Sequence, residues 1–162
     1  MDAAMAKVNE FVLAAASRTE KRDAIGAEAV RALERAIDAG EGRASAWLWL
    51  GRCRKVLRED PRPCWEKAVE TEPGNAEALL ERGRSTLEDY QGLRGDMEVY
   101  RVSYRDHLIY RTPNAESASE AALRLRGEAD LEAARRGGIS GHQAAYLEAL
   151  SSFGRGDYAK AE

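Results

Sequence analysis

Few residues of this chain have the types and spacing that catalysis needs. The two histidines, His107 and His142, stand alone, and the sequence contains no H-E-x-x-H motif, no nucleophile elbow and no phosphate-binding loop. The glycines of Gly137-Gly138-x2-Gly141 lack the strand and helix context of a phosphate cradle. The acidic residues are spread along the chain, as they are on solvated helix faces. We therefore expect no enzyme, no cofactor and no metal site in this segment.

The cysteines do not change this expectation. Cys53 and Cys64 are too few for a disulfide framework and lack C-x-x-C spacing. The sequence favours two buried thiols in a reducing, cytoplasmic compartment, with a redox pair as the alternative if the turn between them is tight. The short apolar run 11–16 has no cationic segment before it, and no run approaches the roughly 18 apolar residues that a membrane span needs.

Composition predicts an all-α protein. Ala, Arg, Glu and Leu make up about half of the 162 residues, whereas Val, Ile and Thr together occupy only 15 positions. A hydrophobic fraction of 44% with 33% charged residues is typical of a folded chain. The formal net charge is −3 and the two signs alternate, so no basic field for nucleic acid exists.

The chain repeats itself with an offset of 32 residues. Residues 33–38 align with residues 65–70, and Gly51 aligns with Gly83. Repeats of 20 to 50 residues are typical of stacked supersecondary units, each of which cannot bury its apolar face alone. Because glycine inside a helix is unfavourable, we expect the matched glycines to lie where helices pack closely. The next comparable glycine, Gly127, follows after 44 residues, so that unit is longer.

Helix punctuation predicts two helices per unit. Asp60-Pro61 is typical of a helix start, and so short a join makes the flanking helices antiparallel neighbours. Pro73-Gly74-Asn75 ends one helix and caps the next. Ser117-x2-Glu120 has the pattern of a capping box for a helix over 117–136, and a further helix is expected over 141–153. At the amino terminus, helical spacing predicts that one face is formed by Met5, Val8, Val12 and Ala15.

These units resemble the tetratricopeptide repeat family, whose pattern runs W-x2-L-G-x2-Y, then A-x3-F, A and P. Trp47-x2-Leu50-Gly51 is similar to the opening of that pattern, and Trp65-x2-Ala68 with Pro73 to its close. Arg54 and Pro61 depart from it. Gly156-Asp157-Tyr158-x2-Ala161 resembles a further inter-helix turn. The resemblance implies a right-handed α-solenoid of antiparallel helix pairs.

A second helical stripe carries the candidate binding residues. Trp47, Leu50 and Gly51 lie on one side of their expected helix, and the candidate binding residues of that helix lie on the opposite side. In the family that the chain resembles, this opposite stripe faces a concave groove that holds extended or helical peptides, and arginines with an aromatic residue there could anchor acidic groups. The alternative is that Trp49 and Arg52 pack against the N-terminal helices. The expected groove residues are Ser45, Trp49, Arg52, Val56, Glu77, Leu80, Glu81 and Arg84.

The extra length of the longer unit contains four of the six tyrosines. Tyr100 and Tyr104 fit helical spacing with Met97 and Leu108, whereas Tyr100, Val102 and Tyr104 alternate as in a strand. The repeat context favours an extended helix. Insertions in repeat arrays often lie on a binding face, so Tyr100 and Tyr104 are candidate contacts, with a wider tyrosine-filled core as the alternative.

The sequence thus predicts one helical domain over 1–162. Its parts are an N-terminal helix region (1–27), the best-matching repeats (28–89), the lengthened Tyr-rich unit (90–113), and a further helix pair with a truncated repeat (114–162). We expect a non-catalytic module that binds a protein or peptide partner, with neither nucleic acid nor membrane as a partner. The alternative is an intramolecular or self-associating scaffold that regulates an enzyme domain in a longer parent chain, so a homo-oligomer is among the expectations.

Overall fold

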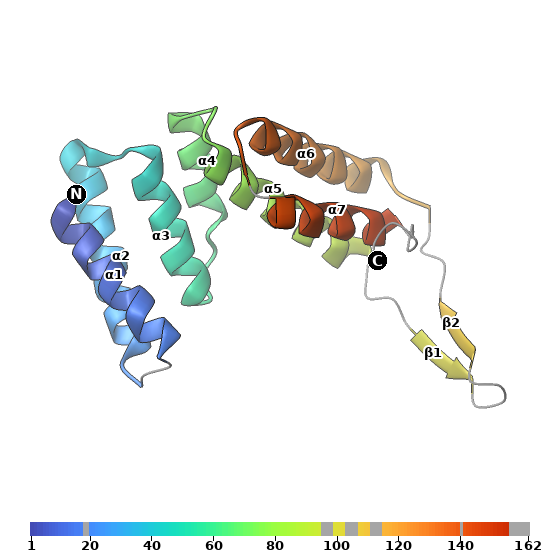
Figure 1. Ribbon diagram of the computed structural model, residues 1–162, viewed down its shortest axis with the longest axis horizontal. Coiled ribbons are helices and arrows are strands. Elements are labelled where there is room, and N and C mark those ends of the chain that lie inside the picture. Colours follow the sequence, from blue (N-terminus) through green and yellow to red (C-terminus); the bar gives the residue numbers. More distant parts are fainter. Residues whose placement is uncertain (18–19, 95–98, 103–106, 111–114, 140, 156–162) are drawn as a thin grey trace. The chain divides into compact units, whose positions relative to one another are not determined.

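The computed structural model describes residues 1–17, 20–94, 99–102, 107–110, 115–139 and 141–155. Its contacts divide the chain into two compact units, Met1–Leu79 and Leu80–Glu162. Helices make up most of both units, and Figure 1 labels each element along the chain. The all-α class predicted from composition is thereby confirmed, apart from one short hairpin in the second unit.

The first unit is a series of helices that pack on their neighbours in the chain. Helix α1 packs on α2, α2 on α3, and α3 on α4. The connections are short, so successive helices run antiparallel. After α2, the chain continues into a π-helical turn, η1, in which Gly40 has a φ of 88°. The bounds are α1 Asp2–Ala16, α2 Arg22–Ala36, η1 Ile37–Glu41, α3 Ala44–Val56 and α4 Arg62–Thr71.

Apolar side chains from these helices form one core. Val8, Phe11, Leu33, Leu50 and Cys53 are all nearly inaccessible to solvent and belong to a single cluster. The buried face of α1 differs from the expected one. The structure buries its residues at 4, 8, 11 and 14 and leaves Val12 47% exposed. Val8 is buried and Met5 partly buried, as expected, but Val12 is wrong, and Phe11, which the pattern omitted, packs next to Gly26 instead.

The predicted caps are confirmed where the side chains are described. The Asp60 carboxylate accepts a hydrogen bond from the backbone amide of Arg62 at 3.1 Å, at the start of α4. The Asn75 side chain accepts one from the amide of Ala78 at 3.0 Å, at the start of α5. Ser117 and Glu120 form the expected capping box at the start of α6. Local sequence therefore sets these helix starts.

The second unit contains most of α5 (Ala76–Arg94), then β1 (Val99–Val102), β2 (His107–Tyr110), α6 (Ala118–Arg136) and α7 (Gly141–Arg155). The strands form a two-stranded antiparallel sheet in which Val99 pairs with Tyr110 and Val102 with His107. The expected extended helix is therefore wrong. Each strand contains a tyrosine and at least one β-branched residue, valine in β1 and isoleucine in β2, and these residues favour extended backbone over helix.

The repeated glycines lie at close helix contacts, as expected. A Cβ added to Gly51 on α3 would be 2.5 Å from the Trp65 indole nitrogen on α4. A Cβ at Gly83 on α5 would be 3.2 Å from the carbonyl oxygen of Gly127, and one at Gly127 on α6 would be 2.6 Å from Leu87. A side chain would collide with its neighbours at Gly51 and Gly127 and would be tightly confined at Gly83, so the three glycines let neighbouring helices approach closely.

Candidate functional site

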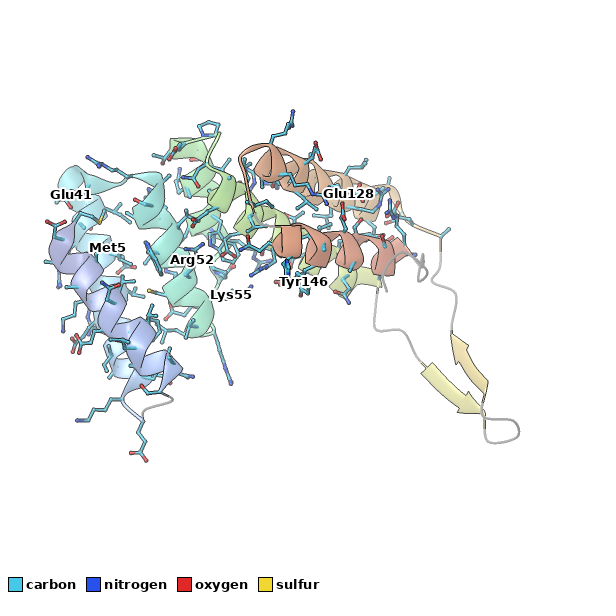
Figure 2. All side chains as sticks on the ribbon, viewed as in Figure 1. Met5, Glu41, Arg52, Lys55, Glu128 and Tyr146 are labelled. Carbon is cyan, nitrogen blue, oxygen red and sulfur yellow. The ribbon has the colours of Figure 1, made fainter. Side chains whose placement is uncertain are left out.

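Five of the expected groove residues belong to the first unit. We call them the Trp49 surface: Ser45, Trp49, Arg52, Val56 and Glu77. The Arg52 guanidinium lies 5.1 Å from the centroid of the Trp49 ring and forms an ion pair with Glu77 at 2.9 Å. Ser45 and Val56 are exposed on the same helix, α3. The structure therefore brings an aromatic ring, a cation and a carboxylate together at the surface of this unit, where Figure 2 labels Arg52.

Trp49 has contacts on two sides. It is partly buried and packs against the core cluster of the first unit. It also carries the Arg52 guanidinium on its ring. The core packing on one side limits the motion of the indole, which lowers the side-chain entropy that the ring loses when a ligand binds.

The other three expected groove residues lie in the second unit and differ in accessibility. Leu80 is 2% exposed and Glu81 8%, so neither presents its side chain to a ligand. Arg84 forms an ion pair with Glu81 at 3.7 Å and lies 5.7 Å from the ring centroid of Tyr146 on α7. Tyr146 is 49% exposed, and its exposure could not be predicted, because a tyrosine beside a leucine in a helix also fits a core position. Figure 2 labels Tyr146.

A partly buried charged network lies at the start of α6. The Arg124 guanidinium donates two hydrogen bonds to Glu116, at 2.8 and 3.0 Å, and a third to Glu128 at 3.0 Å. Arg124 holds the pKa of Glu116 well below its usual range, at about 2. Burial raises the pKa of the neighbouring Tyr90 phenol to about 12. The network therefore stays charged at Glu116 and neutral at Tyr90 across the physiological pH range.

Acidification should remove the stabilisation that Glu116 provides. Because its folded pKa of about 2 lies below its ordinary value of 4.5, the contribution is present above pH 4.5 and is lost as the pH falls from there towards 2. We expect the wild type to melt at a higher temperature than Glu116→Gln at pH 6, and this difference to disappear near pH 2. Thermal melts of both proteins at several pH values measure it. A difference that stays constant with pH would contradict the assignment.

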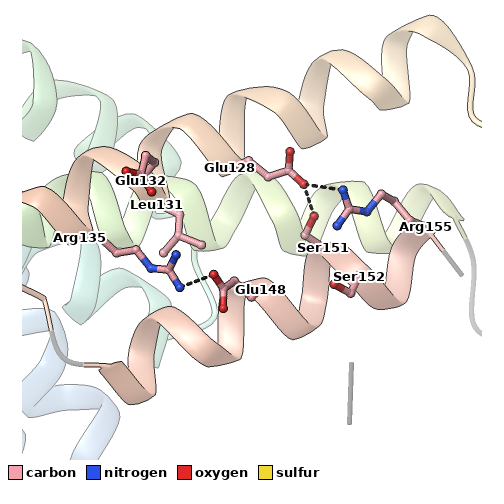
Figure 3. Close-up of a pocket in the computed structure, with 8 residues that line it drawn as sticks. All are labelled: Glu128, Leu131, Glu132, Arg135, Glu148, Ser151, Ser152 and Arg155. Atoms are coloured by element: carbon pink, nitrogen blue, oxygen red, sulfur yellow. Dashed lines mark hydrogen bonds and ion pairs between the residues drawn. The ribbon is translucent and has the colours of Figure 1, made fainter. Parts of the chain in front are cut away.

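A pocket of about 590 Å³ lies between α6 and α7 in the second unit (Figure 3). Glu128 lies at one end and accepts hydrogen bonds from Ser151 and Arg124, with Arg155 at 3.5 Å. Arg135 on α6 forms an ion pair with Glu148 on α7. We call this site the α6–α7 pocket. Its lining residues are Glu128, Leu131, Glu132, Arg135, Glu148, Ser151, Ser152 and Arg155.

Sequence reasoning missed the α6–α7 pocket, although a signal was present. Ser151-Ser152 interrupts a helix otherwise rich in alanine and leucine, and both serines are at least 95% buried. Buried polar side chains require polar partners, and Ser151 has one in Glu128 on α6. Glu128 and Glu132, one helical turn apart on α6, are the counterpart in the sequence.

The described residues contain no cluster of histidine, cysteine, aspartate or glutamate that could hold a metal ion. Cys53 and Cys64 are free and buried, and burial raises the pKa of Cys53 to about 11 and also raises that of Cys64. Both are therefore neutral thiols. Among the described helices, none combines the length and apolar character required to cross a bilayer. Tyr100 lies in β1, and Tyr104 lies outside the described residues.

No protein-family model matches the chain, and comparisons with curated proteins and with solved structures find no significant match. The tetratricopeptide resemblance therefore depends on the quoted residues of this chain alone.

Proposed function

We propose that the chain is a helical protein-interaction module, built as a divergent tetratricopeptide-like solenoid, and that the Trp49 surface holds a segment of a partner protein. The observation that supports this most is the Trp49–Arg52–Glu77 arrangement, in which an indole and a guanidinium are held 5.1 Å apart at the surface. Tryptophan and arginine are the residues most enriched at the energetic centres of protein interfaces.

The charges of this surface define what a partner segment presents. Because Arg52 already pairs with Glu77 at 2.9 Å, an acidic group of the partner competes with Glu77 for the guanidinium. An apolar or aromatic anchor against Trp49 and Val56 meets no such competitor, since Val56 is 42% exposed. The partner segment is therefore anchored by an apolar side chain, with a carboxylate adding affinity only when it displaces Glu77.

Consecutive packing supports the solenoid part of the proposal. In the first unit each helix packs on the next, and Gly51 occupies the close contact between α3 and α4. Such stacking of antiparallel helices is the way in which α-solenoids form extended binding faces.

Panning a library of displayed 12-residue peptides against the purified protein tests this function. We expect the enriched peptides to share an apolar or aromatic anchor, and to bind Trp49→Ala at least about tenfold more weakly, because truncating a central interface tryptophan removes about 2 kcal/mol or more. Arg52→Ala weakens binding without touching the core cluster. The matched control is Leu13→Ala, which truncates a side chain of α1 that is 71% exposed and leaves binding unchanged.

Two outcomes contradict the proposal. One is a panning experiment that enriches no common sequence. The other is a set of peptides whose affinity for the wild type, Trp49→Ala and Arg52→Ala is the same.

A further inference from the structure

Glu77 is the more exposed of the two charged residues of the Trp49 surface. Its side chain is 62% exposed, against 31% for that of Arg52, and its Oε2 accepts a hydrogen bond from Nη2 of Arg52 at 2.9 Å. An ionised carboxylate can accept about four hydrogen bonds, so this pair uses only part of its capacity. The charge that a partner segment meets most directly at this surface is therefore negative.

Local structure supports this charge. Glu77 lies in the first turn of α5, where the helix dipole stabilises an acidic side chain. The start of the helix is itself fixed by Asn75, whose side chain accepts a hydrogen bond from the backbone amide of Ala78 at 3.0 Å. The start of α5 thus holds a charged carboxylate beside Arg52 on α3.

The ion pair makes acidic and basic groups of a partner unequal. A partner carboxylate that binds Arg52 takes the place of Glu77, and the two carboxylates then repel each other. Exchanging one exposed ion pair for another adds little affinity. A basic group of the partner can bind the carboxylate of Glu77 while Arg52 keeps its hydrogen bond and its position 5.1 Å from the centroid of the Trp49 ring.

We infer that Glu77 determines the specificity of the Trp49 surface: it disfavours partner segments with an acidic residue next to the apolar anchor and favours segments with a basic residue there. The inference deepens the proposed function and rests on it, since the ligand is a partner segment anchored at Trp49. It differs from the expectation that the arginine anchors acidic groups. Specific interfaces commonly combine such a repulsive group with the attractive ones.

Three capped dipeptides test this inference: Nα-acetyl-Phe-Lys-amide, Nα-acetyl-Phe-Gln-amide and Nα-acetyl-Phe-Glu-amide. They share an aromatic anchor and differ in the charge next to it. Each is titrated at pH 7 into the wild type and into Glu77→Gln, and the indole NH signal of Trp49 is followed by NMR. We expect the wild type to bind the lysine compound most tightly and the glutamate compound most weakly. In Glu77→Gln this order reverses, and the ratio of the two dissociation constants changes about tenfold.

Glu70→Gln is the matched control. Glu70 is 60% exposed, belongs to the same unit and forms an ion pair with Lys67 on α4, so its replacement removes the same charge from a different place. The order of the three compounds should stay that of the wild type. In 1 M NaCl the difference between wild type and Glu77→Gln should shrink, because salt screens exposed charges. A thermal melt verifies that Glu77→Gln is folded.

The inference is overturned if the ratio of the lysine and glutamate compounds is the same in the wild type and Glu77→Gln, or if Glu70→Gln changes it equally. In both cases binding that moves the Trp49 signal leaves the proposed function standing. If the dipeptides do not bind but a panned peptide does, the same three residues placed next to its anchor give the deciding comparison. If no peptide moves the Trp49 signal, the proposed function and the inference are both lost.

Discussion

Replacing Asp130 by alanine is expected to lower the free energy of unfolding by about 3 kcal/mol or more. The side chain of Asp130 is only 7% exposed and accepts two hydrogen bonds from the Arg82 guanidinium, at 2.7 and 2.6 Å. When one partner of a buried ion pair is removed, the other charge stays buried without a counter-charge. This lowers the free energy of unfolding by much more than replacing the whole pair with apolar residues would. This pair connects α5 to α6 beside the Gly83 contact.

Urea denaturation followed by circular dichroism measures the effect. The matched control is Glu132→Ala, which removes an exposed carboxylate from the same helix two residues away and should change the free energy of unfolding by no more than about 0.5 kcal/mol. A loss of less than about 1 kcal/mol for Asp130→Ala would show that the pair is solvated in solution, and would contradict the burial described above.

The second large effect is expected at Gly51. Leucine at this position should lower the free energy of unfolding by about 3 kcal/mol, because even its Cβ would lie 2.5 Å from the Trp65 indole nitrogen. Trp65 is 1% exposed, so its ring has no free space to move into. The gain in helix propensity on replacing glycine, about 1 kcal/mol, offsets only part of this cost.

Gly74 supplies the control for that substitution. No atom lies within 4 Å of a Cβ placed there, so Gly74→Leu should leave the unfolding midpoint nearly unchanged. If Gly51→Leu and Gly74→Leu shift the midpoint equally, the close contact between α3 and α4 is absent and the reason given for the repeated glycines is wrong.

The helices and their ends could be predicted because local chemistry determines them. Each helix start is capped by side chains that hydrogen-bond to backbone amides only two or three residues away, so the caps could be predicted without knowing the fold. The capping residues are Asp60, Asn75 and the Ser117–Glu120 pair. The role of the repeated glycines was also predictable. Glycine is unfavourable inside a helix, so its recurrence at matched positions indicates that close helix packing requires it there.

The hairpin and the buried face of α1 could not be predicted in the same way. Helical and strand spacing both fitted the segment around Tyr100, and repeat context decided wrongly for the helix. On α1, a face containing Met5 and Val12 and one containing Phe11 both fitted the helical period. In the structure the face that contains Phe11 is buried, because its ring packs against Gly26 on α2. Sequence periodicity does not encode such a contact between two helices.

The candidate site was predicted in part. The helical stripe on α3 correctly grouped Trp49 with Arg52, because residues three apart on a helix are neighbours. When the same stripe was extended to the next sequence repeat, it predicted that Leu80 and Glu81 lie at the surface, but both are buried. The α6–α7 pocket depends on which side chains of two consecutive helices face each other, and helical periodicity alone does not specify this.

The most direct test of the central claim, that the Trp49 surface binds a peptide segment, is the behaviour of the tryptophan indole NH signals in NMR spectra. The chain has three tryptophans, and each signal can be assigned by a tryptophan-to-phenylalanine variant. On addition of a peptide enriched by panning, we predict that the Trp49 signal shifts and saturates, whereas the signal of the buried Trp65 stays in place. A peptide that binds the protein and leaves the Trp49 signal unmoved would contradict the account.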